Sequence, residues 1–223
     1  MLIFILAALW SMPYLSSSYF FSQYATAAHQ KAARENGIQI CCSWGKEIDD
    51  GTLTYSIDDD ANPQVIQAVH QAVDEWNSKV PNIQLQEVTG SNADIDIMTM
   101  SKAPKVTHSD SIDESEISDG KNIKLVQPGE AQTSFDRRGL INHVDITIST
   151  KARGSAIGLS GLESIVKHEI GHAYGIGHVN FIGDLMSPVL TDTTNTDISQ
   201  CHINGIEEAN TSPHAPSTQF LRC

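Results

Sequence analysis

The sequence predicts an α+β domain in which a sheet is covered by helices on one side, and three observations lead to this class. Several short stretches alternate apolar and polar residues with the period of two that is typical of strands. One longer stretch has apolar residues at helical spacing, and a histidine-rich helical stretch follows the last predicted strand. Strands, a helix, more strands and then helices suit a sheet with one covered face.

The individual elements follow from local signals. Residues 53–57 (LTYSI) form a first strand, because they alternate and are rich in residues that favour strands. A helix begins at Pro63, behind the N-cap residue Asn62, and ends before Pro81. The remaining predicted elements are strands at residues 83–88, 93–100 (ADIDIMTM) and 142–150 (NHVDITIST), a helix from about Leu162, and a weaker helix from about residue 197 to residue 210.

The string HEIGHAYGIGH has the spacing of a zinc site. His168 and His172 are four residues apart on a helix, so both imidazoles can reach one ion at roughly 2.0–2.1 Å. Glu169 is rotated off that face and can lie beside an open coordination position. Gly175 tolerates the left-handed backbone that ends a helix, which lets His178 approach from a third side. Three neutral ligands leave a fourth position for water, as in a catalytic zinc site.

Two other interpretations fit the motif less well. An amphipathic helix that merely carries histidines does not need this spacing, which chance produces far less often than the shorter HExxH pattern. A purely structural metal site would need a fourth protein ligand, and the motif does not supply one. The spacing therefore favours catalysis.

The motif resembles that of the metzincin zinc endopeptidases, in which HExxHxxGxxH is followed by a methionine in a tight turn beneath the metal. Met186, in the string DLMSP, stands eight residues after His178 in the corresponding place. The sequence LMSP is most similar to that of the matrixin branch, although Val179 differs from the residue that matrixins typically carry after the third histidine. The resemblance implies a metzincin-type catalytic domain with a mixed five-stranded twisted sheet, an active-site helix, a packing helix and a C-terminal helix.

Three further expectations come from this resemblance. Residues 121–127 (KNIKLVQ) correspond by position to the antiparallel edge strand that holds an extended peptide by strand addition, with an ordinary sheet strand as the alternative. The acidic stretch within residues 101–121 is expected to be a solvated loop, with a Ca²⁺-binding loop as the alternative. Residues 187–190 are expected to form a wall of the pocket for the side chain that follows the cleaved bond, with a preference for an apolar residue.

The ligand set predicts a zinc metalloendopeptidase. A zinc ion held by three neutral imidazoles keeps its charge and lowers the pKa of a bound water from 15.7 towards about 7. Glu169 would take the proton of that water and pass it to the departing amine. The alternatives are a non-catalytic zinc-binding interaction module, and a narrower zinc hydrolase that cuts cell-wall peptides or a single partner.

The N-terminal region predicts export. Residues 1–28 contain no charged side chain, and they have an apolar core and a small-residue cleavage site at residues 25–27. A positively charged start is missing, so the alternatives are an N-terminal anchor or a buried segment. We expect a signal peptide or anchor at 1–28, an N-terminal segment at 29–50 and the peptidase domain at 51–223. The protein would be secreted, or anchored to the outer face of a membrane.

The four cysteines agree with export. Cys41, Cys42, Cys201 and Cys223 form an even set near the two ends of the domain, where bridges from the N-terminal segment to the C-terminal helix and tail would join the termini. Three pairings exist, and a Cys41–Cys42 bridge is disfavoured because adjacent residues form a strained ring. In an alternative, a free thiolate of Cys41 or Cys42 occupies the fourth position of the zinc ion and keeps the enzyme latent.

The charge limits the partners of the protein. The formal net charge is −13, and no basic stripe is present, which argues against nucleic-acid binding. We expect a monomer that binds an extended polypeptide substrate and contacts a membrane only if residues 1–28 stay as an anchor.

Overall fold

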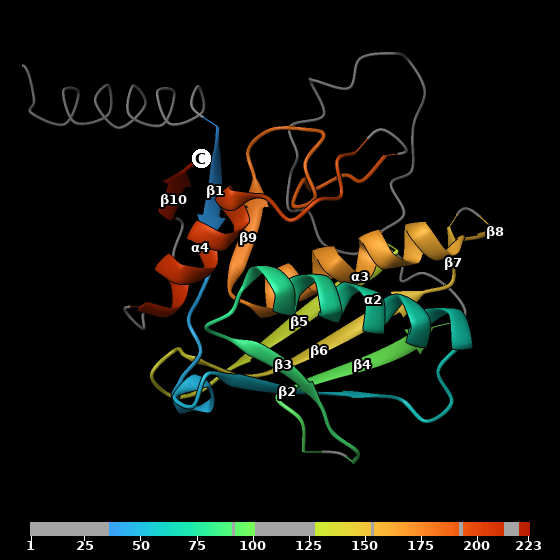
Figure 1. The fold of residues 1–223 in the computed structure, drawn as a ribbon, viewed down its shortest axis with the longest axis horizontal. Helices are drawn as coiled ribbons and strands as arrows, with labels where there is room; N and C mark the ends of the chain where they lie inside the picture. The colour runs from blue at the N-terminus through green and yellow to red at the C-terminus, as the bar shows by residue number, and fades with distance from the viewer. Residues whose placement is uncertain (1–35, 91, 101–127, 153, 192–193, 212–218) are drawn as a thin grey trace, which may run out of the picture. The chain divides into compact units, whose positions relative to one another are not determined.

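Five strands form the central sheet of the computed structural model, in the order β3-β2-β4-β6-β5. The β2–β3, β2–β4 and β4–β6 pairs are parallel, and the edge strand β5 is antiparallel to β6. The sheet is twisted, and the fold is the predicted α+β class (Figure 1). The strands are Thr52–Ile57 (β2), Gln84–Glu87 (β3), Ile95–Met100 (β4), Gly129–Phe135 (β5) and Ile141–Ser149 (β6).

Several predictions concern residues that the structure does not describe. The structure describes residues 36–90, 92–100, 128–152, 154–191, 194–211 and 219–223. The predicted leader at residues 1–28, the acidic stretch within 101–121 and the predicted edge strand at 121–127 lie outside these residues. Within the described residues, no helix combines the length and apolar character needed to cross a membrane.

Two helices lie side by side on one face of the sheet (Figure 1). The first is α2, Pro63–Lys79, and the predicted cap is confirmed, because the Asn62 side chain accepts a hydrogen bond from the Gln64 N–H at 2.9 Å. The second is α3, Leu159–Ala173, which starts at Leu159 rather than at the predicted Leu162. Its first turn contains a serine and a glycine, which are weak helix formers, so the sequence pattern places the start too late.

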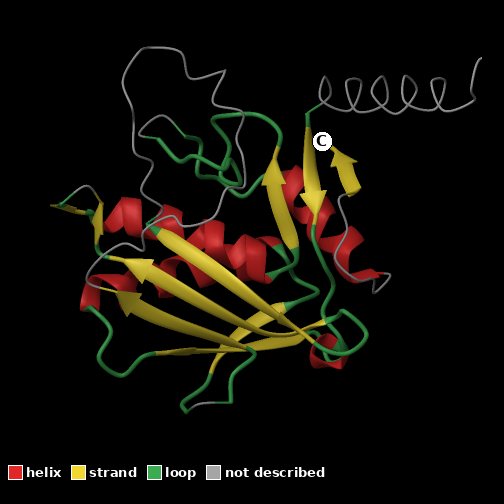
Figure 2. Ribbon diagram, turned by 180° about the vertical axis from the view of Figure 1, so that it is seen from behind, coloured by secondary structure: helices red, strands yellow, loops and turns green. Residues whose placement is uncertain are grey.

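The opposite face of the sheet has no described helix over it, as the view from behind shows (Figure 2). Side chains along β4 and β6 alternate between the two faces, and the residues that face the helices are fully or almost fully buried. The buried residues on the face toward the helices are Ile95, Ile97, Val144, Ile146 and Ile148. Ile141, which lies beyond a register shift in the β5–β6 pairing, is also buried.

A second, smaller sheet joins the two ends of the described chain. It has the order β10-β1-β9, and β1 is antiparallel to both neighbours. Residues of the predicted N-terminal segment, 29–50, thus contribute a strand whose Ile38 and Ile40 side chains are fully buried. The strands are Gly37–Ile40 (β1), Ile176–Val179 (β9) and Gln219–Arg222 (β10).

Four short elements complete the described fold. The C-terminal helix α4, Gln200–Thr211, confirms the weaker predicted helix. A 3-10 helix, η1, covers Lys46–Ile48, and the small strands β7 (Lys151–Ala152) and β8 (Ser155–Ala156) pair just before α3.

The disulfides differ from the predicted pairing. Cys41 bonds to its neighbour Cys42, and Cys201 bonds to Cys223, so the prediction that disfavours the adjacent pair is wrong. The backbone N–H groups of Cys41 and Cys42 both donate to the Gly175 carbonyl oxygen, at 3.0 and 3.3 Å. Because two adjacent N–H groups reach the same acceptor, the backbone here is not an extended strand, in which adjacent side chains point to opposite faces. No cysteine is free, which removes the thiolate that could have blocked the zinc ion.

Hydrogen bonds make the connection that a disulfide was expected to make between the N-terminal segment and α4. The Ser43 hydroxyl donates to the Ala209 carbonyl oxygen, and the Trp44 N–H donates to the Asn210 side chain at 3.3 Å. Pairing of β1 with β10 adds a further link between the ends. The two ends are therefore joined, but without a covalent bond between them.

Candidate metal centre

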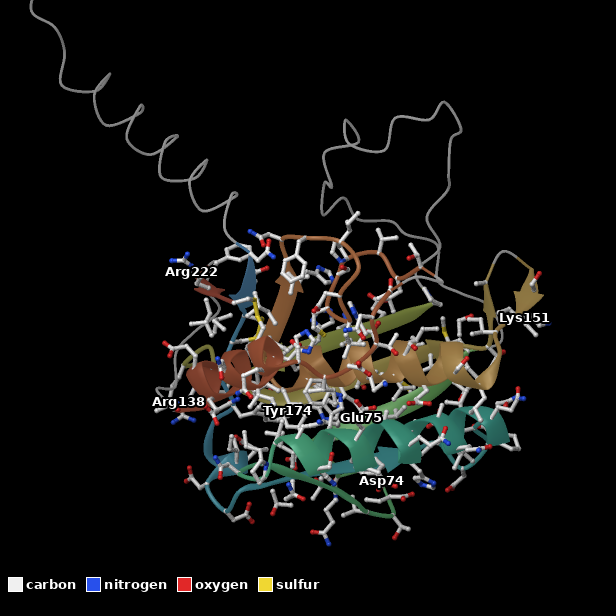
Figure 3. The ribbon with its side chains drawn as sticks, turned by 45° about the horizontal axis from the view of Figure 1, so that its top comes forward. Asp74, Glu75, Arg138, Lys151, Tyr174 and Arg222 are labelled. Atoms are coloured by element: carbon white, nitrogen blue, oxygen red, sulfur yellow. A yellow bond between two sulfur atoms is a disulfide. The ribbon has the colours of Figure 1, made fainter. Side chains whose placement is uncertain are left out.

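Helix α3, which carries the first two histidines, is fixed against α2 by polar contacts as well as by apolar packing. The Trp76 indole N–H donates to the Lys167 carbonyl oxygen at 3.1 Å. The Lys167 ammonium, 5% exposed, pairs with Glu75 at 2.9 Å and with Glu163 at 3.3 Å, and Figure 3 labels Glu75 between the two helices. These contacts fix the middle of the motif helix against α2.

The turn after α3 requires glycine at position 175. Gly175 has φ +96°, and a Cβ on it would meet the Cys42 carbonyl oxygen at 2.2 Å. Its own carbonyl oxygen accepts the two N–H groups of Cys41 and Cys42. The chain then enters β9, which carries His178 back toward α3. The predicted doubling back of the chain is present.

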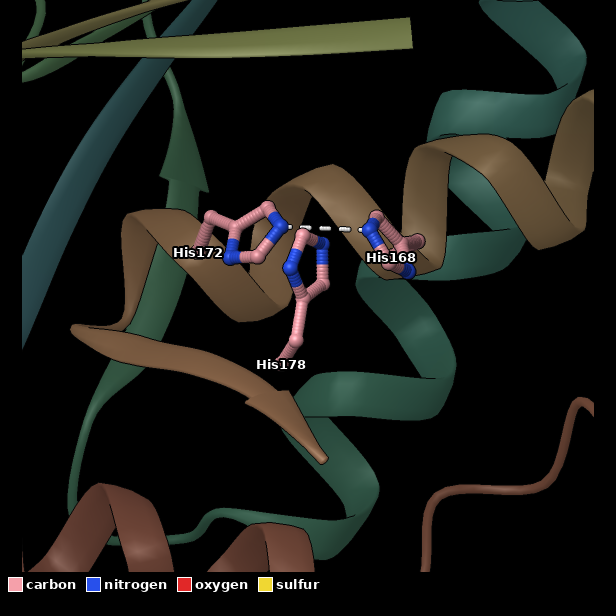
Figure 4. Close-up of side chains that lie close together, drawn as sticks. All are labelled: His168, His172 and His178. Carbon is pink, nitrogen blue, oxygen red and sulfur yellow. Dashed lines mark hydrogen bonds between the residues drawn. The ribbon is translucent and has the colours of Figure 1, made fainter. Parts of the chain in front are cut away.

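The three histidines converge (Figure 4). Their ring centroids are 4.7 Å apart for His168 and His172, 4.8 Å for His172 and His178, and 5.3 Å for His168 and His178. One ring nitrogen from each lies within 4.8 Å of the others, so the three side chains could hold a single metal ion.

Backbone carbonyls set the orientation of two of the rings. The Nδ1–H of His168 donates to the Leu185 carbonyl oxygen at 2.7 Å, and that of His172 donates to the Ile176 carbonyl oxygen at 2.9 Å. Both Nε2 atoms then carry lone pairs, and they face each other at 3.1 Å. Two lone pairs at this distance suit a shared cation, because ligands at about 2.0–2.1 Å from a tetrahedral zinc stand roughly this far apart.

The protonation of the three rings also fits a metal. Burial, and then the charge of His172, lowers the pKa of His168 to about 3. Burial, and then the charge of His178, lowers the pKa of His172 to about 4. Burial, and then the charge of His168, lowers the pKa of His178 to about 4. All three rings are therefore neutral at physiological pH, which is the form that binds zinc.

Glu169 lies in a buried position against strand β5. Burial, followed by the negative charge of Glu130, raises its pKa to about 8, and a hydrogen bond from the Ala131 N–H acts in the opposite direction. Its Oε2 atom has no hydrogen-bond partner among the described residues. A Cβ on Gly129 would lie 2.5 Å from its Oε1 atom. The start of β5 therefore limits the space around the Glu169 carboxylate. The sequence pattern does not indicate this contact between β5 and Glu169.

Met186 lies fully buried in a turn that also contacts His168. Its carbonyl oxygen accepts the Val179 N–H at 2.9 Å, so the turn is connected to the strand of His178. The neighbouring Leu185 carbonyl oxygen orients His168. Asp184 Oδ1 accepts the Met186 N–H at 2.8 Å and the His202 ring N–H at 2.7 Å, which connects the turn to α4. Asp184 and His202 are positioning residues that no local sequence signal reveals.

The comparison with known families agrees with this geometry. A family model described as Matrixin matches residues 43–210, which include the five strands of the central sheet, the histidine motif and Met186. No curated protein matches the chain at a significant level. Because the family match covers well over half of the sequence, this chain belongs to the matrixin family of metallopeptidases.

Proposed function

We propose that the protein is an exported zinc-dependent endopeptidase, in which His168, His172 and His178 hold the catalytic ion and Glu169 moves the proton. The observation that carries this proposal is the convergence of three neutral imidazoles, two of them with Nδ1 bound to a carbonyl. The buried carboxylate on the same helix supplies the acid–base group.

The zinc ion and the residues of the chain would have different roles in the reaction. When bound, zinc would lower the pKa of water in the site and polarise the substrate carbonyl. Glu169 accepts a proton from the attacking water and delivers it to the departing amine, and its raised pKa suits both steps. The carbonyls of Leu185 and Ile176 keep two imidazoles in the tautomer that binds a metal. Met186 forms the floor of the site.

We assign the binding of an extended polypeptide to β5, whereas the strand predicted at 121–127 lies outside the described residues. Among the described strands, β5 is at the end of the sheet order, so none of them pairs with the outer side of its backbone, where a substrate strand could be added. Its first residues contact Glu169, which would place a peptide paired along β5 next to the acid–base group. The apolar preference expected from residues 187–190 remains a prediction about the adjoining pocket.

Export is supported by two features. The four cysteines are all paired in disulfides, which persist in oxidising compartments. The uncharged residues 1–28 would act as a cleaved signal or as an anchor to the outer face of a membrane.

The test uses Glu169→Gln in the full chain, with casein and gelatin as substrates. We expect normal zinc uptake and a loss of kcat/KM of about 10²–10⁴-fold, because general acid–base catalysis typically contributes this much. A chelator should abolish wild-type activity and added zinc should restore it. The matched control is Glu208→Gln, the same change at an exposed position on α4.

Two results would reject the proposal. Wild-type activity in Glu169→Gln would remove this residue from the mechanism, and activity that resists chelation would remove the zinc ion. Zinc uptake without cleavage of any peptide would instead indicate a zinc-binding interaction module. Cleavage confined to cell-wall peptides or a single protein would indicate the narrower hydrolase.

A further inference from the structure

Strand β5 carries one acidic side chain where the edge of the sheet meets the proposed acid–base group. This residue is Glu130, and its neighbours on both sides, Gly129 and Ala131, lie against Glu169. A Cβ on Gly129 would lie 2.5 Å from Glu169 Oε1, and the Ala131 N–H donates a hydrogen bond to the same carboxylate. Glu130 itself is exposed. It therefore belongs to the part of β5 along which the proposed substrate would lie next to Glu169.

The pairing of β5 with β6 determines the face of the sheet on which the Glu130 side chain lies. Gly129 is opposite Ile148, which faces the helices and is fully buried. Glu130 is opposite Thr147, so both side chains lie on the other face, which has no described helix over it (Figure 2). A residue of an added strand that is opposite Glu130 would place its side chain on this same face.

The direction of the backbone groups determines how closely a substrate residue would approach Glu130. The Pro128 carbonyl oxygen accepts the Ser149 N–H at 2.7 Å, so it points to β6. Backbone groups of an antiparallel strand alternate in direction, so those of Glu130 also point to β6 and those of Ala131 point to the outer side. An antiparallel substrate residue opposite Glu130 would therefore form a non-hydrogen-bonded pair with it. In such pairs the Cα atoms are only about 4.5 Å apart and the side chains are closest.

The Glu130 carboxylate lacks a partner of opposite charge within the part of the chain that the structure describes. The ion pairs of lysine, arginine and histidine there do not include it. The next side chain on the same face of β5 is that of Gln132, which is uncharged. Opposite charges on neighbouring strands stabilise their pairing, and like charges weaken it. A lysine or arginine of the substrate would therefore supply the missing charge, and an acidic residue would be repelled.

We propose that Glu130 is a specificity-determining residue, which selects polypeptides that place a lysine or arginine opposite it, close to the cleaved bond. This inference rests on the proposed function, because it requires that the substrate pairs with β5. The formal net charge of −13 would favour basic peptides in general. Glu130 would add a preference at one position of the substrate, and this distinguishes its effect from that of the overall charge.

The experiment compares peptides that differ at one residue. Cleavage sites of the zinc-loaded full chain are mapped in casein, and peptides around one site are made with Lys, Gln or Glu at each position in turn. At one position near the cleaved bond, we expect kcat/KM to be about fivefold higher for Lys than for Gln, the upper end for a cross-strand charge pair. Glu should be the poorest residue there. Because Glu130 is exposed, high salt should weaken the preference.

Two substitutions test the charge itself. Glu130→Gln should remove the difference between the Lys and Gln peptides, and Glu130→Lys should make the Glu peptide the best of the three. The comparison uses ratios between peptides on one enzyme, so a change in the proton transfer by Glu169, which affects all peptides alike, does not alter it. The loss should appear mainly in KM, because this charge pair forms whenever the substrate is bound. Glu208→Gln on α4 is the matched control and should keep the wild-type preference.

Three outcomes would overturn the proposal. They are a wild type that cleaves the Lys and Gln peptides equally well at every position, a preference for Lys that persists in Glu130→Gln, and an equal loss of this preference in Glu208→Gln. The last outcome would assign the preference to the overall charge. A wild type that cleaves no peptide would overturn the proposed function and this inference with it, whereas cleavage without a basic preference would overturn the inference alone.

Discussion

At Gly129, the absence of a side chain leaves the space that the Glu169 carboxylate occupies. A Cβ at this position would lie 2.5 Å from Glu169 Oε1 and 2.6 Å from Ile165 Cγ2. Real Cβ atoms do not approach other atoms this closely, so a larger residue must displace one of these two groups. The end of the Glu169 side chain is more flexible than the buried Ile165, so the carboxylate should move.

We therefore predict that Gly129→Ala folds, binds zinc normally and loses kcat by about 10²-fold, as expected for a displacement of about 1 Å in a catalytic group. Steady-state kinetics and metal analysis test this together. Gly158→Ala is a suitable control, because no atom lies within 4 Å of a Cβ placed there. An unchanged kcat in Gly129→Ala would show that β5 does not position the carboxylate.

The candidate ligands could be predicted from sequence because helical spacing alone fixes the direction of His168 and His172. Five intervening residues, with Gly175 at their centre, then suffice to bring His178 back. The groups that shift the pKa of Glu169 could not be predicted, because they come from a distant part of the chain. Glu130 and Ala131 act on Glu169 across almost forty residues of sequence, and only the folded sheet brings them together.

At the scale of elements, a strand can be predicted from sequence where one of its faces is buried, and it is missed where neither face is buried. Strands β2, β4 and β6 alternate clearly because their apolar residues face the helices. Edge strand β5, GEAQTSF, has no large apolar residue before Phe135 and mostly exposed side chains, so it has no pattern to detect. Backbone pairing with β6 stabilises it instead. The adjacent-cysteine bridge is missed for a similar reason, because a distant carbonyl, that of Gly175, bends the backbone there.

The hairpin that joins β5 to β6 depends on Asp136. Its Oδ1 accepts the N–H groups of Arg138 and Leu140 at 2.8 and 2.9 Å, and Oδ2 accepts the Arg138 side chain at 2.7 Å. The hydrogen bond from Leu140, together with smaller effects of Arg138, lowers the pKa of this exposed carboxyl. The carboxylate form is therefore favoured in the folded state.

We predict that Asp136→Ala lowers the thermal stability of the metal-free protein at pH 7. Since the folded pKa lies below the unfolded value of about 3.9, the contribution of Asp136 is complete above that value and is lost as the pH falls through the folded pKa. The Tm values of the two proteins should therefore converge as the pH falls below about 4. Glu208→Ala, which removes an exposed carboxylate on α4, is the control. A constant difference at all pH values would contradict this role.

On the scale of the whole molecule, a single core cluster connects the sheet, the helices and the N-terminal segment. Trp44, from the N-terminal segment, donates its indole N–H to the Ala173 carbonyl oxygen at the end of α3 at 2.7 Å. Tyr174 packs against Trp76 of α2, with ring centroids 5.3 Å apart. The end of the motif helix therefore has partners from several elements, and the proposed metal site lies on elements that belong to the same core cluster.

This organisation predicts how metals affect global stability. An ion that binds only the native state stabilises it by RT ln(1 + [L]/Kd), about 2.7 kcal/mol at a concentration of 100 Kd. Chelation should therefore lower the Tm, and micromolar Zn²⁺ should restore it. His168→Ala with His172→Ala should remove this effect of Zn²⁺, because the variant lacks two of the three proposed ligands.

Screening of the overall charge is the effect that must be separated from specific binding. With a formal net charge of −13, the chain repels itself, and any cation reduces this repulsion. Screening depends on ionic strength, which micromolar zinc does not change, whereas roughly 0.15 M salt shortens the Debye length to about 8 Å. Micromolar Mg²⁺ should therefore leave the Tm unchanged, and NaCl should raise it equally in all variants. If Mg²⁺ matches Zn²⁺ at equal concentration, the stabilisation does not depend on the imidazole ligands.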